Sequence, residues 1–187
     1  MRRLTVLGTL AALVVLTAGP ALAQAPAKAP QAPPKLSDEM LAGWNATAKK
    51  LIEMAEDFPE DKYDFKPTPE VRSFRQILLH IAGVTYMFIN PVKNMGAGEE
   101  DPAADKFKTK KDVVAYLTQS FADGATVIRE QSEAGQMKLV KHPFADRMTT
   151  QHNLWAMGIE HGSEHYGNLV VYYRLNKRVP PASRPQR

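Results

Sequence analysis

Two of the five histidines, His161 and His165, stand four residues apart in the stretch GIEHGSEHYGN. On an α-helix, residues i and i+4 lie on the same face with Cβ atoms about 5–6 Å apart, so both imidazoles could reach one metal ion. A solvated helix face is the alternative, because such pairs also occur there by chance. The face of this pair also carries Leu154, Gly158, Leu169 and Tyr172. An inward-facing pair needs partners for its ring nitrogens, and a metal ion supplies one to each imidazole.

His80 is the natural third ligand. It lies in the apolar stretch QILLHIAGV. The alternative is that His80 is a core histidine satisfied by a hydrogen bond. However, an inward-facing histidine pair in the same small domain favours a single site shared by all three imidazoles. Three histidines leave a coordination position open, which is the pattern of catalytic rather than structural zinc sites. Water in such a position is acidified towards neutrality. The pair is not a zincin motif, because Gly162 follows His161 where that motif has Glu.

Other polar residues near the histidines could orient them or contact a substrate. Gln76 precedes His80 by one helical turn. Glu160 and Glu164 lie about 100° around the helix from the pair, and we interpret them first as solvated or interhelical carboxylates. Their alternative role is to orient an imidazole or to serve as a fourth ligand. The sequence names no general base, so the catalytic residues stay unknown.

The remaining two histidines are interpreted as non-ligands. His142 precedes a proline in a loop, and His152 lies more than two helical turns before His161. Trp44, Trp155 and Tyr86 stand among apolar residues at helical spacing, which favours a role in the core or in a pocket wall.

Four amphipathic helical stretches, separated by Pro- and Gly-rich breaks, position the histidines: 37–57, 73–90, 109–135 and 150–175. A Ser-x-x-Gln capping box begins at Ser73 and a weaker Thr-x-x-Asp box at Thr109. We expect Ser37 to cap the first helix and Asn176 to end the last one in a left-handed conformation. No strand pattern is convincing. The sequence therefore predicts an all-α fold, a four-helix bundle with a longer loop between helices 2 and 3.

The first 23 residues have the pattern of a secretory signal peptide, with a basic start, an apolar run and an Ala-Leu-Ala ending. An uncleaved membrane anchor is the alternative. Residues 24–36 are rich in Ala and Pro and are predicted to be a flexible linker. The bundle domain is then predicted to cover 37–183, in a periplasmic or secreted protein.

Charge and composition narrow the classes of partner. After loss of Arg2 and Arg3 the chain has 24 − 2 = 22 basic and 20 acidic residues, a net charge of +2. These charges are interspersed, which argues against a nucleic-acid partner. The chain has no cysteine, so any metal must be held by His, Asp or Glu.

Two longer stretches resemble the DinB-like superfamily of metal-binding four-helix bundles: EHGSEHYGNLVVYYRLNKRVPPAS and YDFKPTPEVRSFRQILLHIAG. The resemblance implies that His80, His161 and His165 are the metal ligands. It also implies an activity among those of the family, which include thiol-dependent transferases, isomerases and hydrolases. Common members have Arg and Gln where this chain has Tyr166 and Asn168. Substrate contacts at those two positions therefore remain open.

Together these observations favour an exported protein that binds a divalent metal through three histidines and acts as a hydrolase on an unknown small molecule. A thiol transferase is less favoured, because small cytosolic thiols are absent outside the cytoplasm. Zinc or nickel is expected ahead of iron or manganese. A non-catalytic metal-binding protein and an interaction module are the alternatives, and a homodimer is one option for the oligomeric state.

Overall fold

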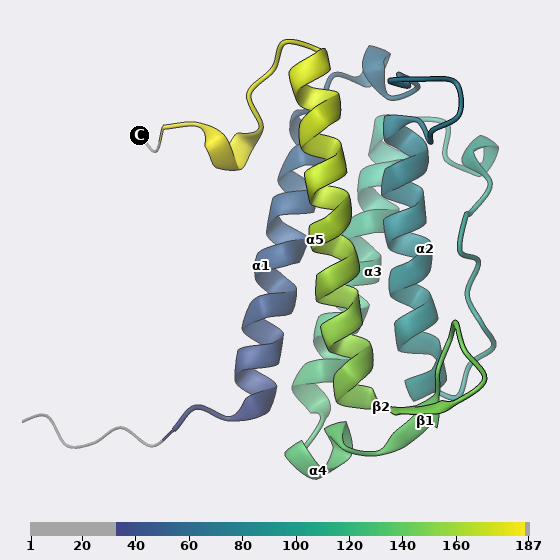
Figure 1. Ribbon diagram of the computed structural model, residues 1–187, viewed down its shortest axis with the longest axis vertical. Helices are drawn as coiled ribbons and strands as arrows, with labels where there is room; N and C mark the ends of the chain where they lie inside the picture. Colours follow the sequence, from purple (N-terminus) through teal and green to yellow (C-terminus); the bar gives the residue numbers. More distant parts are fainter. Residues whose placement is uncertain (1–32, 186–187) are drawn as a thin grey trace, which may run out of the picture. The chain divides into compact units, whose positions relative to one another are not determined.

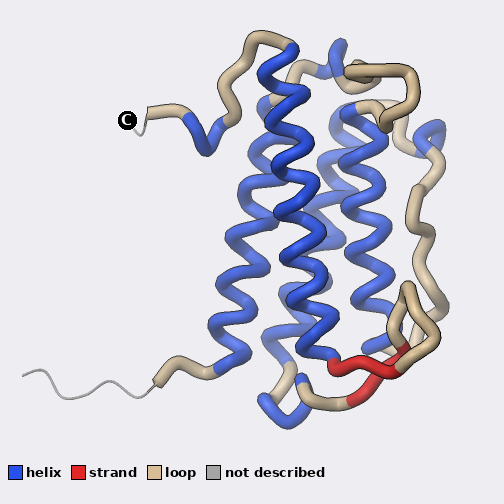
Figure 2. The backbone as a smooth tube through the Cα atoms, in the orientation of Figure 1, coloured by secondary structure: helices blue, strands red, loops and turns tan. Residues whose placement is uncertain are grey.

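A computed structural model describes residues 33–185, so the predicted signal peptide and residues 24–32 of the predicted linker lie outside the described residues. Four long helices form a bundle (Figures 1 and 2): α1 (Leu36–Asp57), α2 (Phe74–Val92), α3 (Lys110–Glu130) and α5 (Gln151–Leu175). The predicted all-α four-helix class is confirmed. The shorter elements are α4 (Glu133–Gln136), strands β1 (Leu139–Lys141) and β2 (Met148–Thr150), and 3-10 turns at Glu60–Lys62, Ala104–Lys106 and Pro181–Ser183.

The directions of α2 and α3 require the long loop that connects these two helices. Helix α1 packs against α3 and α5, and α2 packs against the same two helices. Figure 1 shows α2 and α3 running in the same direction, with residues 93–109 returning along the outside of the bundle between them. Because an α-helix rises about 1.5 Å per residue, this loop must span the length of α2 before α3 can begin.

Local sequence signals account for most helix ends. Ser73 accepts a hydrogen bond from the Gln76 backbone, and the Gln76 side chain accepts one from the Ser73 backbone. Thr109 forms the same reciprocal box. Two expectations were wrong: Lys35 rather than Ser37 occupies the first N-cap position, and the left-handed residue after α5 is Lys177 (φ 56°), not Asn176.

The segment after α3 also differs from the expectation. Helix α3 ends at Glu130 rather than near residue 135, because Gln131 is extended and its side chain bonds the indole of Trp155 at 3.0 Å. Strands β1 and β2 then pair antiparallel, where no strand was expected. Each strand has three residues, too few for an alternating pattern to be recognised in the sequence.

The core is centred on the indole of Trp44, which is fully buried. Its Nε1 donates to the Phe121 carbonyl at 2.9 Å, and its ring packs edge-on against Trp155. Gly124 of α3 and Gly158 of α5 face this ring so closely that a Cβ on either would lie 2.3 or 2.5 Å from it. Trp44 and Trp155 are therefore core residues, and α5 is held close to α1 at the level where its histidines begin.

Candidate metal centre

The three histidines predicted as ligands converge between α2 and α5. The Nε2 atom of His161 lies 3.2 Å from Nε2 of His80 and 3.1 Å from Nε2 of His165. His80 is buried with 6% of its surface exposed, and the other two side chains are half-buried. The helical spacing places His161 and His165 on one face, and the packing of α2 on α5 adds His80.

This arrangement fits one metal ion. At metal–nitrogen bonds of about 2.0–2.1 Å, neighbouring nitrogens of a tetrahedral site are about 3.3 Å apart, close to the two separations found. Burial and the neighbouring imidazoles lower the pKa of His161 to about 3, and burial lowers that of His165 to about 4. Both rings are therefore neutral near pH 7, which is the state that binds metals. The cluster could hold a divalent metal.

A carboxylate and a guanidinium complete the surroundings of His80. Asp101, in the loop after α2, lies with Oδ1 3.1 Å from Nδ1 of His80. Arg72 donates to both oxygens of Asp101, from Nε at 2.9 Å and from Nη2 at 2.8 Å. The Arg72 guanidinium lowers the pKa of Asp101, so this carboxylate is ionised and only accepts hydrogen bonds. A neutral His80 then has its proton on Nδ1 and its lone pair on Nε2, facing the cluster.

Sequence reasoning missed both Asp101 and Arg72. The available signals were an acidic run, Glu99 to Asp101, in the long loop and an arginine directly before the capping Ser73. Neither signal places the loop against α2.

The other residues considered from the sequence lie in different places. Asn168 is near the cluster, with Nδ2 3.3 Å from Nδ1 of His165. Gln76 caps α2 and borders a pocket with Asp101. Glu164 is exposed, and Tyr166 faces Lys50 of α1, whose Nζ is 5.6 Å from the ring centre.

The two histidines interpreted as non-ligands lie outside the cluster. His152 bonds Gln136 at 3.2 Å, and His142 accepts from the Phe144 backbone at 3.1 Å.

Residues 31–184 match the family model described as DinB family. The chain belongs to the DinB family. The resemblance seen in the two quoted stretches thus extends across the whole bundle.

Relatives of this DinB protein include YjoA of Bacillus subtilis strain 168, which is 27% identical over 140 residues, 74% of this chain and 89% of YjoA. The crystal structure of YjoA is similar with a TM-score of 0.60 at 22% identity, covering 75% of this chain and 93% of that one. YfiT of Bacillus subtilis is similar with a TM-score of 0.62 at 16% identity, covering 82% and 95%. YfiT is described as a probable metal-dependent hydrolase with an unusual four-helix bundle topology.

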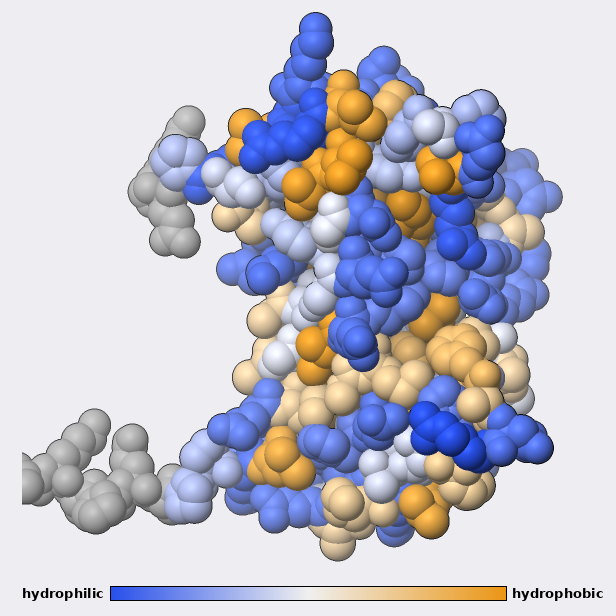
Figure 3. Space-filling model, in the orientation of Figure 1, coloured by the Kyte–Doolittle hydropathy of each residue, from blue (hydrophilic) through white to orange (hydrophobic). Residues whose placement is uncertain are grey.

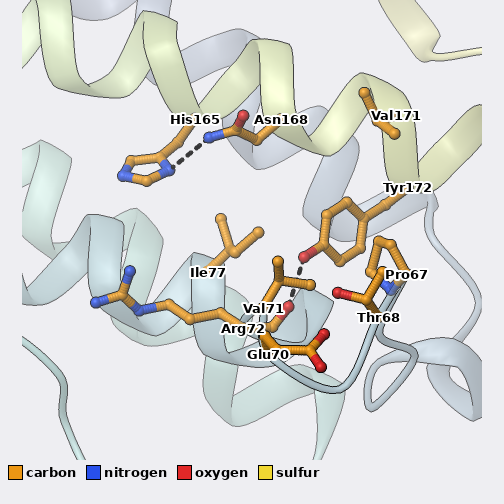
Figure 4. A pocket seen from close by; sticks show the side chains of 10 residues that line it. All are labelled: Pro67, Thr68, Glu70, Val71, Arg72, Ile77, His165, Asn168, Val171 and Tyr172. Carbon is orange, nitrogen blue, oxygen red and sulfur yellow. Dashed lines mark hydrogen bonds between the residues drawn. The ribbon is translucent and has the colours of Figure 1, made fainter.

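A pocket of about 580 Å³ adjoins the histidine cluster of this DinB protein. Helix α5 forms one wall, and the loop before α2 forms the other (Figure 4). A smaller pocket of about 320 Å³ lies on the side of Asp101, and both pockets are bordered by Arg72. The centre is therefore accessible from a concave surface large enough for a small molecule.

Proposed function

We propose that this DinB protein binds one divalent metal ion through His80, His161 and His165 and hydrolyses a small-molecule ester, amide or phosphoester. The convergence of three Nε2 atoms, two pairs of which lie 3.1–3.2 Å apart, carries the proposal. When bound, such an ion supplies Lewis-acid chemistry, because it polarises a carbonyl or phosphoryl oxygen and acidifies water. The description of YfiT as a probable metal-dependent hydrolase supports this assignment.

The chain's own residues keep the imidazoles in the ligating form. Asp101 accepts the Nδ1 proton of His80, and Arg72 keeps Asp101 ionised. If His165 binds the metal through Nε2, its proton is on Nδ1. The side-chain amide of Asn168 faces Nδ1, and a 180° flip of this amide would let Oδ1 accept a hydrogen bond from the Nδ1 proton. Such outer partners fix the ring orientation and the tautomer of a metal ligand.

Export is part of the proposal and rests on the first 23 residues of the sequence. Within residues 33–185, no helix is both long enough and apolar enough to cross a membrane. Zinc or nickel is proposed as the ion, since three imidazoles suit both. A location outside the cytoplasm favours water over a small thiol as the second substrate.

Metal content and turnover test the proposal directly. The protein isolated without chelators should contain about one equivalent of a divalent metal by elemental analysis. The loaded protein should hydrolyse at least one substrate in a panel of esters, amides and phosphoesters. If the protein contains metal but hydrolyses none of the substrates, it is a non-catalytic metal-binding protein. If it contains no stoichiometric metal, the result favours an interaction module. Replacement of His152, a histidine of α5 outside the cluster, is the matched control and should change neither result.

Asp101→Ala should weaken metal binding by about 10–100-fold, the usual cost of losing the outer partner of a metal-bound histidine. The reason is that His80 would lose the acceptor that holds its proton on Nδ1. Asp101→Asn should recover part of the affinity, because an amide oxygen can still accept that proton. Competition with a chromophoric chelator measures the change.

Glu99→Ala is the control for the same acidic run, since Glu99 pairs only with Lys106, at 3.6 Å, among the described residues. Equal losses of affinity in the Asp101 and Glu99 variants would indicate a general effect of charge rather than the contact with His80.

A further inference from the structure

The pocket beside His165 differs in chemistry between its two ends. At the end near the cluster, Figure 4 shows the ring of His165 and the guanidinium of Arg72, with Asn168 next to His165. Arg72 uses Nε and Nη2 to hold Asp101, while its Nη1 makes no hydrogen bond within residues 33–185. This end therefore offers a donor to an oxygen atom of a ligand.

The body of the pocket is apolar. Ile77 forms its floor with 5% of its surface exposed, and Val71 and Val171 lie on opposite walls with 40% and 52% exposed. The Tyr172 hydroxyl already donates to the Arg72 carbonyl, so this residue presents its ring to the pocket. Pockets that bind small molecules are lined mainly by apolar side chains, with a few polar groups that fix the orientation of the ligand.

The outer rim indicates the charge of that ligand. Glu70 lies there, and hydrogen bonds from its own backbone and from Thr68 lower its pKa, so it is ionised. A negative charge at the far end of a ligand would be repelled. Leu175 follows Val171 by one turn of α5 and is 56% exposed. Figure 3 shows apolar surface over the C-terminal part of this helix. The rim thus disfavours an anionic chain, and its apolar surface suits an extended alkyl chain or a ring.

We propose that this pocket is the acyl subsite of the substrate: it takes a neutral alkyl or aryl chain whose carbonyl head lies between the histidine cluster and Nη1 of Arg72. The proposal rests on the proposed function, since it assigns the substrate class of the same centre. A volume of about 580 Å³ is within the range of small-ligand pockets, which favours a single small amphiphile. The substrate class is then an ester or amide of a neutral medium-chain or aromatic acid.

Straight-chain hydroxamates test the subsite, because they combine a metal-binding head with a chain of chosen length. Calorimetric titration of the zinc-loaded protein should give at least about tenfold tighter binding for octanohydroxamate than for acetohydroxamate, since each fully buried methylene contributes roughly a factor of four. Val171→Asp should reduce this ratio by at least about tenfold. Met137→Asp, at a similarly exposed position outside the pocket, should leave the ratio unchanged. Equal affinities for the two hydroxamates would overturn the subsite.

A second measurement separates failure of the subsite from failure of the metal centre. In the metal-free protein, octanamide should still shift the methyl NMR signals of Val71 and Val171, because neither wall depends on an ion. Shifts at both valines support the subsite even if no metal binds. Absence of shifts overturns the subsite even if acetohydroxamate binds the loaded protein.

Discussion

Replacement of His161 by alanine should abolish stoichiometric metal binding. Its Nε2 lies 3.2 and 3.1 Å from the Nε2 atoms of the other two histidines, so it is the central member of the cluster. Loss of a direct ligand should cost more than the 10–100-fold that follows loss of an outer partner. The variant should still fold, because alanine favours the helix and the replaced ring is only half-buried.

Thermal unfolding with and without a chelator measures the same loss independently of activity. In the wild type, metal at a hundredfold excess over its dissociation constant should add about 2.7 kcal/mol to the free energy of unfolding, and chelation should remove it. In the His161 variant, the chelator should leave the melting temperature unchanged. The His152→Ala control should behave like the wild type. One tightly bound equivalent of metal in the His161→Ala protein would show that the centre lies elsewhere.

Gly83→Ala should lower both the free energy of unfolding and the metal affinity, although Gly83 is not itself a proposed metal ligand. A Cβ at this position would lie 2.3 Å from the Glu99 carbonyl oxygen and 2.7 Å from that of Glu100. Those atoms belong to the backbone of the loop that carries Asp101 to His80. The loop would therefore have to move away from α2, and Asp101 would lose its contact with Nδ1 of His80.

The Gly83→Ala substitution should change the free energy of unfolding and the metal affinity by different amounts. Overpacking of this kind costs about 1–3 kcal/mol of unfolding free energy, and the gain of about 1 kcal/mol in helix propensity offsets only part of it. Metal affinity should fall by about 10–100-fold, as expected for Asp101→Ala. Chemical denaturation and chelator competition measure the two effects.

Gly167→Ala is the matched control, because a Cβ at this exposed position of α5 meets nothing within 4 Å. It should raise the free energy of unfolding by up to about 1 kcal/mol through helix propensity and should not change metal affinity. Gly83→Ala and Asp101→Ala act through the same contact, so their effects on metal affinity should not add in the double variant. Full additivity would mean that Gly83 acts on the centre by another route.

Most of the features that the sequence alone predicted arise from local interactions. The boxes at Ser73 and Thr109 join residues three positions apart, and His161 and His165 share a face because the helix repeats every 3.6 residues. The length of the loop between α2 and α3 was also visible as a gap between two periodic segments. Such features need no knowledge of the rest of the molecule.

The missed features depend on weak or distant signals. Asn176 and Lys177 are adjacent, and which of them adopts the left-handed conformation depends on packing at the end of α5. The β1–β2 pair is held by backbone hydrogen bonds between short strands with three of six side chains exposed, so it leaves almost no side-chain pattern.

The tertiary structure decided which residues surround the histidines. Helix period determines the direction of a side chain on its own helix, but the distance from His80 to His161 depends on how α2 packs against α5. Asp101 reaches His80 only because Gly83 lets the loop backbone lie directly on α2. The pocket beside His165 likewise forms only where the loop before α2 meets α5. Contacts between segments far apart in the chain depend on close packing, which hydrophobic periodicity does not specify.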